Sequence, residues 1–264
     1  MLKCKICEKS GIFEKFDEDV IKCKKCNSMY YTGSQNKEIP RVVSVTSNLK
    51  SSAQKKNSQL IARSYLQYLK KKANIDFENA LDIGCGFGDF VEELNKIGIN
   101  AGGIESDEDT VKNAKSHVSH GFFDELYDST IKYDFISVNQ TLYYFEDSFV
   151  ILKKISDLLK PNGIVMIATV NTESSFRQEH KIWTQGCKIC FGNEVWKSFD
   201  KFGLKCIDIT SYDDNLFIDF FLNKSNMMSK SQFLKNLVFY VSKIKKLFVY
   251  KHNGINNFIL LKKF

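Results

Sequence analysis

The 264-residue chain lacks the long apolar segments that would tie a protein to a membrane. No apolar run approaches the ~18 residues that a membrane-spanning helix needs. The first residues, Met1-Leu2-Lys3-Cys4, open no apolar core of the kind that a secretion signal requires. We therefore expect a soluble cytoplasmic protein, whose eight cysteines are metal ligands or core residues rather than disulfides.

Arginine is also scarce, since only Arg41, Arg63 and Arg177 occur among the 38 basic side chains. The arginine fork is the favoured group for reading bases and gripping phosphates, so its scarcity argues against sequence-specific recognition of nucleic acid. Lysine is concentrated in residues 224–264, which hold nine lysines and no acidic residue; the net charge of +7 therefore leaves −2 for the rest. This basic segment predicts either peripheral contact with an anionic surface or a solvated lysine face on a helix.

The chain divides into three segments of different composition. The hydrophobic content of 43% and the charged content of 26% exclude a disordered or collagen-like protein. We interpret residues 1–33 as a small zinc-binding ribbon and residues 34–56, rich in Ser, Lys, Asn and Gln, as a linker. Residues 57–264 form the main domain, where short apolar strands alternate with amphipathic helices. This alternation predicts an α/β fold with a parallel sheet covered on both faces.

The periodicity of apolar residues predicts the individual elements of the main domain. Strands are expected at residues 80–83, 101–105, 133–139, 164–170, 205–210 and 258–261. Helices are expected at residues 57–73, 89–96, 107–115, 148–159, 193–202 and 227–250. Ser106 is predicted to cap the third helix, and a turn at residues 160–163 is predicted to end the fourth.

Four N-terminal cysteines have the spacing of a metal site. Cys4, Cys7, Cys23 and Cys26 follow the pattern C-x2-C-x15-C-x2-C, which can bring four sulfur atoms around one ion. About 30 residues bury too little surface to fold alone, and zinc binding would supply the missing stability. Four protein ligands leave no position for water, so we predict a structural Zn²⁺. An iron–sulfur site or a redox pair is the alternative.

The remaining cysteines give a weaker signal. Cys187 and Cys190 form a third C-x2-C pair without a partner pair, and two sulfurs cannot complete a tetrahedral site. Packing in the core or beside a pocket is expected for them, with redox chemistry as the alternative. Cys206 lies in a predicted strand and is expected in the core.

A glycine loop follows the first predicted strand of the main domain. In residues 81–89, Leu-Asp-Ile-Gly-Cys-Gly-Phe-Gly-Asp, the glycines allow a tight turn and close approach to a ligand. Asp89 stands where a dinucleotide fingerprint has a third glycine or alanine, so its charge disfavours a pyrophosphate. Glu105 ends the next strand, where a carboxylate can accept both ribose hydroxyls. A nucleoside without phosphates suggests S-adenosylmethionine.

With these motifs the chain resembles the class I S-adenosylmethionine-dependent methyltransferases, most densely over residues 80–171. The resemblance implies a Rossmann-like seven-stranded sheet whose last strand is antiparallel. It implies that S-adenosylmethionine is bound by the following residues: Asp82, Gly84, Cys85, Gly86, Glu105, Ser106, Phe123, Asn139 and Gln140. The cysteine ribbon makes the chain similar to methyltransferases of sugar and capsular-polysaccharide pathways. A Leu-Glu-His pattern typical of relatives is replaced by Leu142-Tyr143-Tyr144.

Three residues are candidates for the catalytic step. A carbohydrate hydroxyl needs a base as the new bond forms, and His180 lies just after the fourth predicted strand on the ligand side. A surface or hydrogen-bonded structural role is the alternative for His180. Tyr143 and Tyr144 can place an aromatic ring against the sulfonium or the acceptor, or can pack in the core.

The sequence thus predicts a methyltransferase that acts on a sugar, a nucleotide sugar or a surface-glycan substituent, most simply at oxygen. One alternative is an rRNA or tRNA methyltransferase that grips RNA through the ribbon and the basic segment. A second alternative is a non-catalytic subunit that binds the cofactor and acts as a scaffold.

Overall fold

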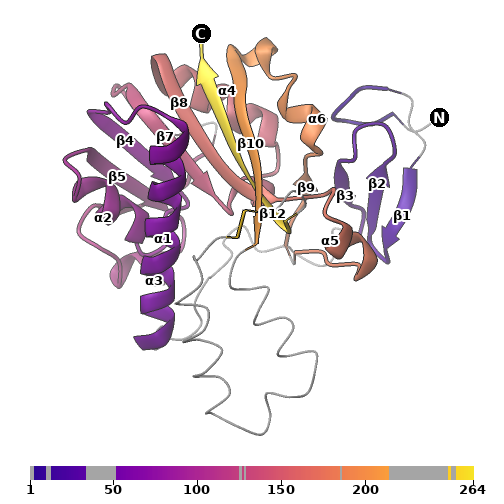
Figure 1. Ribbon diagram of the computed structural model, residues 1–264, viewed down its shortest axis with the longest axis horizontal. Coiled ribbons are helices and arrows are strands. Elements are labelled where there is room, and N and C mark those ends of the chain that lie inside the picture. The colour runs from indigo at the N-terminus through magenta and orange to yellow at the C-terminus, as the bar shows by residue number, and fades with distance from the viewer. Residues whose placement is uncertain are drawn as a thin grey trace, which may run out of the picture.

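The computed structural model describes residues 3–9, 13–33, 52–124, 127, 129–184, 186–213, 249–250 and 254–264. Within these residues the chain forms a large sheet with helices on both faces and a small N-terminal sheet beside it (Figure 1). Most of the predicted linker at 34–56 and of the basic segment at 224–264 lies outside the described residues. The predicted helix at 227–250 does so too, except that its last two residues form a strand.

The large sheet has the strand order β11-β10-β12-β8-β7-β4-β5-β6. Its strands are β4 (Asn79–Ile83), β5 (Asn100–Glu105), β6 (Val118–His120), β7 (Tyr133–Asn139), β8 (Leu159–Val170), β10 (Leu204–Asp213), β11 (Val249–Tyr250) and β12 (Asn256–Lys263). The five strands from β8 to β6 pair in parallel, and β12 is antiparallel to both β8 and β10. This confirms the seven-stranded sheet with an antiparallel last strand, to which β11 adds a two-residue edge.

Alternating side chains of the strands fill two separate layers of core. Phe135 of β7 packs in one layer with α1 (Ser52–Lys72) and α2 (Asp89–Asn95). Its neighbour Ile136 packs in the other layer with α4 (Ser148–Leu158). Successive residues of a strand point to opposite faces, so the continuous apolar runs predicted from the sequence follow from burial on both sides.

The small sheet is made by β1 (Phe13–Asp17), β2 (Val20–Cys23), β3 (Met29–Tyr31) and β9 (Ile189–Cys190). The fourth strand comes from the main domain and pairs antiparallel with β3. A second contact joins the same two segments, because the Gly192 amide donates to Ser28 Oγ at 3.1 Å. The cysteine-bearing module is therefore docked on the main domain by backbone pairing.

The remaining helices are short, and two of the predictions for them are wrong. They are α3 (Glu108–Lys112), α5 (Ser175–Glu179), α6 (Asn193–Trp196) and two short 3₁₀ turns, η1 (Leu142–Tyr144) and η2 (Asp200–Phe202). The single helix predicted at 193–202 is wrong, because bonds from Ser198 to Val195 and from Phe202 to Phe199 have 3₁₀ spacing and interrupt it. The cap of α3 is Asp107 and not Ser106, whose hydroxyl donates instead to Glu105.

The predicted turn at residues 160–163 lies within the bounds of β8, but these residues do not take part in the regular pairing of β8 with β7. Tyr133 pairs with Leu159 and Phe135 pairs with Ile164, so four residues of β8 lie opposite the single residue Asp134 of β7. Asn162 has φ +65° there, as a tight turn requires.

Among the described residues, we find no helix with both the length and the hydropathy needed to cross a membrane.

Candidate active site

The carboxyl ends of β4, β5 and β7 meet at one edge of the large sheet. The chain passes from β4 to β5 and β6 on one side and then returns to β7 on the other. Open α/β sheets bind ligands at such a reversal of strand order. A cavity of about 1060 Å³ lies there, and the residues that follow the three strands line it.

The glycine loop after β4 forms one wall of the cavity. Gly84 and Gly86 have φ of +67° and +56°, in the left-handed region that favours glycine. A Cβ on Gly84 would lie 2.4 Å from Thr141 Oγ1, so this glycine allows two loops to pack together. A Cβ on Gly86 would meet nothing within 4 Å, because it would extend into open space. The loop thus leaves room for a ligand at Gly86.

Glu105, at the end of β5, is held rigidly beside this loop. One of its carboxylate oxygens accepts from the Gly86 amide at 2.9 Å. The other accepts from the Ser106 amide at 2.8 Å and from the Asp107 amide at 3.0 Å. Each oxygen of a carboxylate has two lone pairs, so the group can accept further bonds from a ligand. Glu105 therefore presents an oriented acceptor to the cavity.

Asp82, on β4, lies deeper and is 3% exposed. Its pKa is raised to about 7, chiefly by burial and in smaller part by the nearby Glu105 charge, while the hydrogen bond from Ser137 opposes the shift. The same oxygen accepts from Ser137 Oγ at 2.6 Å and from Asn139 Nδ2 at 3.3 Å. Asn139 Oδ1 is itself buried without a hydrogen-bond partner. This pair of acceptors suits a ligand that brings a cation or donors to the end of β7.

Every residue predicted to bind the cofactor lines this one cavity: Asp82, Gly84, Cys85, Gly86, Glu105, Ser106, Phe123, Asn139 and Gln140. Gln140 is further fixed from both sides, because it accepts from the Tyr143 hydroxyl and donates to Tyr212. The structure brings these residues together from the ends of four strands, β4, β5, β6 and β7. Their contact with a cofactor stays a prediction.

The three candidate catalytic residues have different positions. Tyr144 lines the cavity, and burial raises its pKa to about 12, so its hydroxyl is protonated at neutral pH. Tyr143 is 4% exposed and packs with Cys187 and Cys190 outside the lining. His180 follows α5 and stacks on Phe176, whose carbonyl lies 3.1 Å from Nδ1. His180 is not among the described residues that line the cavity, so its position does not support the role of base.

Sequence reasoning missed several lining residues. Thr141 covers the glycine loop. Ile61 and Tyr65, on α1, form another part of the cavity wall. Lys188 enters the cavity from the segment between α5 and β9. None of them belongs to a recognisable motif; the only signal was the predicted pocket-side packing of the adjacent Cys187.

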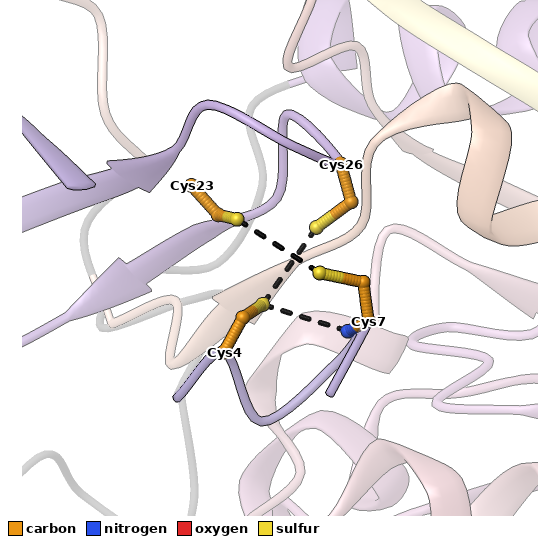
Figure 2. A group of neighbouring side chains, drawn as sticks. All are labelled: Cys4, Cys7, Cys23 and Cys26. Atoms are coloured by element: carbon orange, nitrogen blue, oxygen red, sulfur yellow. Dashed lines mark hydrogen bonds between the residues drawn. The ribbon is translucent and has the colours of Figure 1, made fainter. Parts of the chain in front are cut away.

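The N-terminal cysteines converge on a common centre. Figure 2 shows the side chains of Cys4 and Cys7 pointing from one loop toward those of Cys23 and Cys26 on another. All four sulfur atoms lie within 4.8 Å of one another. The Cys4–Cys26 and Cys7–Cys23 sulfur distances are 3.7 and 4.0 Å. A tetrahedron with zinc–sulfur bonds of about 2.3 Å has edges of about 3.8 Å, so the cluster has the size of a zinc site.

The two loops that carry the cysteines have the same backbone geometry. The amides of Glu8 and Asn27 donate back to the carbonyls of Cys4 and Cys23, each at 2.9 Å. Both residues have φ of +57°, so each C-x2-C pair sits on a tight left-handed knuckle. Paired knuckles of this form place four sulfurs inward, as a closed structural site requires.

The third C-x2-C pair lies elsewhere. Cys187 and Cys190 are 0% and 2% exposed and pack against Tyr143 and Val170. Burial raises the pKa of the Cys187 thiol, which disfavours the reactive thiolate. This agrees with the predicted packing role. Cys206 is half-buried against the core.

Comparisons with known proteins bear on the same region. A family model described as a methyltransferase domain matches residues 53–205. The chain is 31% identical over 99 residues to a ubiquinone biosynthesis O-methyltransferase of Bradyrhizobium diazoefficiens, covering 34% of this chain and 39% of that protein. It is 30% identical over 121 residues to the Actinobacillus pleuropneumoniae protein of the same name, covering 40% and 52%. The chain thus spans about half, or less, of the length of these curated relatives.

Solved structures share the fold. Magnesium protoporphyrin IX methyltransferase of Synechocystis, with bound S-adenosylhomocysteine, matches with a TM-score of 0.53 at 12% identity, covering 83% of this chain and 90% of that one. An S-adenosylmethionine-dependent methyltransferase of Archaeoglobus fulgidus matches with a TM-score of 0.52 at 18% identity, covering 78% and 93%. Because the family model covers more than half of the chain and the sheet has the expected order, the chain belongs to the class I S-adenosylmethionine-dependent methyltransferases.

Proposed function

We propose that the enzyme transfers a methyl group to a hydroxyl of a sugar or sugar-linked acceptor. The main observation in favour of a cofactor site is the position of the Glu105 carboxylate. It accepts a hydrogen bond from the Gly86 amide, in a glycine loop that is open toward the cavity. The family supplies S-adenosylmethionine as methyl donor. The acceptor proposal rests on the ribbon, on the aromatic lining residues and on oxygen as the atom named for the curated relatives.

The residues of the cavity suit each part of S-adenosylmethionine. Glu105 would accept the ribose hydroxyls, and Gly86 leaves space where a side chain would interfere. Asp82 and Asn139 Oδ1 would receive the ammonium group of the methionine part. Phe123, 4% exposed, would border the adenine. When bound, the cofactor supplies an electrophilic methyl group to the acceptor.

The protein's part in the reaction is mainly alignment. A methyl transfer is an in-line displacement, and positioning the nucleophile supplies much of the rate. Tyr144 and Phe145 both line the cavity and offer flat rings against which a sugar can stack. The protonated Tyr144 hydroxyl can donate a hydrogen bond but cannot take the acceptor's proton. His180 stays a prediction for the base.

We propose further that the cysteine cluster binds one structural Zn²⁺. Cys4, Cys7, Cys23 and Cys26 fit the ion by number, chemistry and spacing. Tyr30 lies 2.6 Å from the Cys4 sulfur, and Ser28 lies 3.3 Å from the Cys26 sulfur. Hydroxyl groups in such positions can orient thiolate ligands. The ion would stabilise a module too small to fold on its core alone.

The test is methyl transfer from labelled S-adenosylmethionine to a panel of acceptors. We expect label on nucleotide sugars or glycan fragments, located at oxygen by mass spectrometry. Label on rRNA or tRNA alone, with binding that weakens steeply as salt rises, would favour the RNA alternative. Cofactor binding without label on any acceptor would favour the non-catalytic alternative.

A phenolic hydroxyl is the second candidate acceptor. The curated relatives are named ubiquinone biosynthesis O-methyltransferases, and an aromatic ring also suits the Tyr144 and Phe145 walls. A catechol in the same panel separates this candidate from the sugars. Transfer to the catechol at a rate at least about tenfold above any sugar would overturn the sugar proposal.

A further inference from the structure

Lys188 is the one basic side chain among the described residues that line the cavity. Its side chain is 18% exposed, and burial lowers its pKa. Removing an ammonium group from water is costly unless a counter-charge or hydrogen bonds compensate it. An anion beside this ammonium group would supply that compensation, so the anion that Lys188 pairs with bears on what the cavity binds.

The backbone of Lys188 is fixed from two sides. Its amide donates to the Tyr143 carbonyl at 2.8 Å, and its carbonyl accepts from the Tyr31 amide at 3.1 Å. The next residues form β9, which pairs with β3 (Figure 1). The ribbon and the η1 turn thus hold the lysine in place at the cavity wall.

The present partner of Lys188 is an exchangeable one. Its ammonium pairs with the Glu146 carboxylate, whose side chain is 86% exposed. An ion pair with such an exposed group contributes little stability, because water solvates the carboxylate equally well. A ligand that carries its own negative charge can therefore replace Glu146 at small cost.

Several other carboxylates line the cavity. Among the described residues, none of them forms a hydrogen bond or an ion pair with Lys188. The residues predicted to bind the cofactor all lie between positions 82 and 140, whereas Lys188 comes from the segment after β8. Asp147 is engaged as the cap of α4, since it accepts from the amides of Phe149 and Val150. The Lys188 and Glu146 side chains thus form no direct hydrogen bond or ion pair with a described residue that is predicted to bind the cofactor.

We infer that Lys188 is a specificity-determining residue that binds an acidic group, phosphate or carboxylate, on the acceptor. Glu146 is the charge that the acceptor displaces. This inference rests on the proposed function and narrows it from sugars in general to acidic sugars, such as sugar phosphates, nucleotide sugars or uronic acids. Lysine ammonium groups bind phosphate and carboxylate as compact point charges.

The experiment measures binding of three probes to the full-length protein by ligand-observed NMR. Glucose 1-phosphate carries a phosphate, glucuronate carries a carboxylate, and glucose is the neutral reference. Titrations are run with and without saturating S-adenosylhomocysteine, so that the result does not depend on cofactor binding. The variants are Lys188→Ala and Glu146→Gln. The matched controls are Lys197→Ala and Glu194→Gln, which alter an exposed Lys–Glu pair on and beside α6 at 2.7 Å.

We expect at least one acidic sugar to bind about tenfold or more tightly than glucose, and Lys188→Ala to remove this difference. The two acidic probes distinguish phosphate from carboxylate as the group recognised. Glu146→Gln should tighten binding of the acidic sugar, a gain that a purely structural role for the pair would not produce. The control variants should match the wild type.

The inference is overturned if neither acidic sugar binds better than glucose, or if Lys188→Ala retains the preference. Failure of the proposed function has a different signature: the wild type would show no affinity for S-adenosylhomocysteine, or would methylate no sugar, whatever the outcome for the probes.

Discussion

The two carboxylates at the ends of β4 and β5 have opposite surroundings. Glu105 accepts hydrogen bonds from three backbone amides. Asp82 accepts from a hydroxyl and a side-chain amide in a buried site, and its pKa rises to about 7. The charge of Asp82 therefore changes in the physiological range, where an arriving ammonium group would stabilise it.

The pKa of Asp82 predicts that cofactor affinity depends on pH. A cationic ligand favours the ionised carboxylate, so binding should weaken as pH falls below about 7, by up to tenfold per unit. The folding stability of the free protein should change with pH in the opposite direction. The raised pKa means that the folding stability from this group is complete below its ordinary value of 3.8 and is lost as pH rises through about 7.

Calorimetric titration and thermal melts between pH 5.5 and 8.5 check both parts. Asp82→Asn removes the titrating group and should flatten both profiles. An equally steep affinity profile in Asp82→Asn would show that another group is responsible.

Gly86 offers a second test at the level of a single residue. Gly86→Ala introduces a methyl group at φ +56° that extends into the cavity, so cofactor affinity should fall by at least about tenfold. The control is Gly98→Ala, because Gly98 has φ +88° and equally open surroundings but does not line the cavity. Both variants should lose about 1 kcal/mol of stability, and only Gly86→Ala should lose affinity. Equal affinity in the two variants would contradict the site.

Residues with a local reason for their identity were predictable from the sequence. The glycines of the loop and Glu105 follow strand ends at fixed spacing, and the structure places them together. Lys188 was not predictable, because it reaches the cavity through pairing with a strand more than 150 residues away in sequence. Ser106 was assigned to the wrong helix position because the neighbouring Glu105 competes for its hydroxyl.

At the level of elements, the contact between β3 and β9 joins the cysteine module to the cavity. β3 begins three residues after Cys26, and β9 begins at the residue after Lys188. A metal that holds the knuckles together would therefore also hold the wall from which Lys188 extends. If Lys188 binds the acceptor as we propose, loss of the metal should affect the acceptor more than the cofactor.

Cys23→Ser should test that coupling. We expect loss of bound zinc by elemental analysis, faster hydrogen exchange in β3 and β9, and a fall of at least about tenfold in transfer to the acceptor. Cofactor affinity should change by less than about threefold, because the residues predicted to bind the cofactor lie on or directly after β4, β5, β6 and β7. The control is Cys206→Ser, since Cys206 is half-buried but outside the cluster. Unchanged exchange in β9 after zinc loss would contradict the coupling.

Elements with a strong apolar pattern of their own were predicted better than elements that exist only through pairing. β7 has the bounds expected from the sequence, because burial of apolar side chains on both of its faces leaves a strong signal. β9 and β11 are two-residue strands that exist only through pairing, so no local periodicity announces them. The break between α6 and η2 depends on 3₁₀ bonds around aromatic residues that pack in the core.

Over the whole molecule, the order of the strands brings distant chemistry to one place. The reversal at β4 joins a loop at residue 84, a carboxylate at residue 105 and an amide at residue 139 around a single cavity. The η1 turn and the ribbon hold the segment that carries Lys188 at the cavity wall. The predicted fold class is confirmed, because the alternation of strands and helices in the sequence determines it. The choice of acceptor depends instead on the side chains that line the cavity, which the alternation does not predict.

The most direct test of the account is a calorimetric titration of the purified protein with S-adenosylmethionine. We predict one site per chain, and loss of at least about 100-fold in affinity in Glu105→Ala, because two hydrogen bonds to a charged acceptor disappear. Glu108→Ala, at an exposed carboxylate on α3, should bind as the wild type does. No heat at millimolar cofactor, or equal affinity in Glu105→Ala, would contradict the claim that this cavity is the cofactor site.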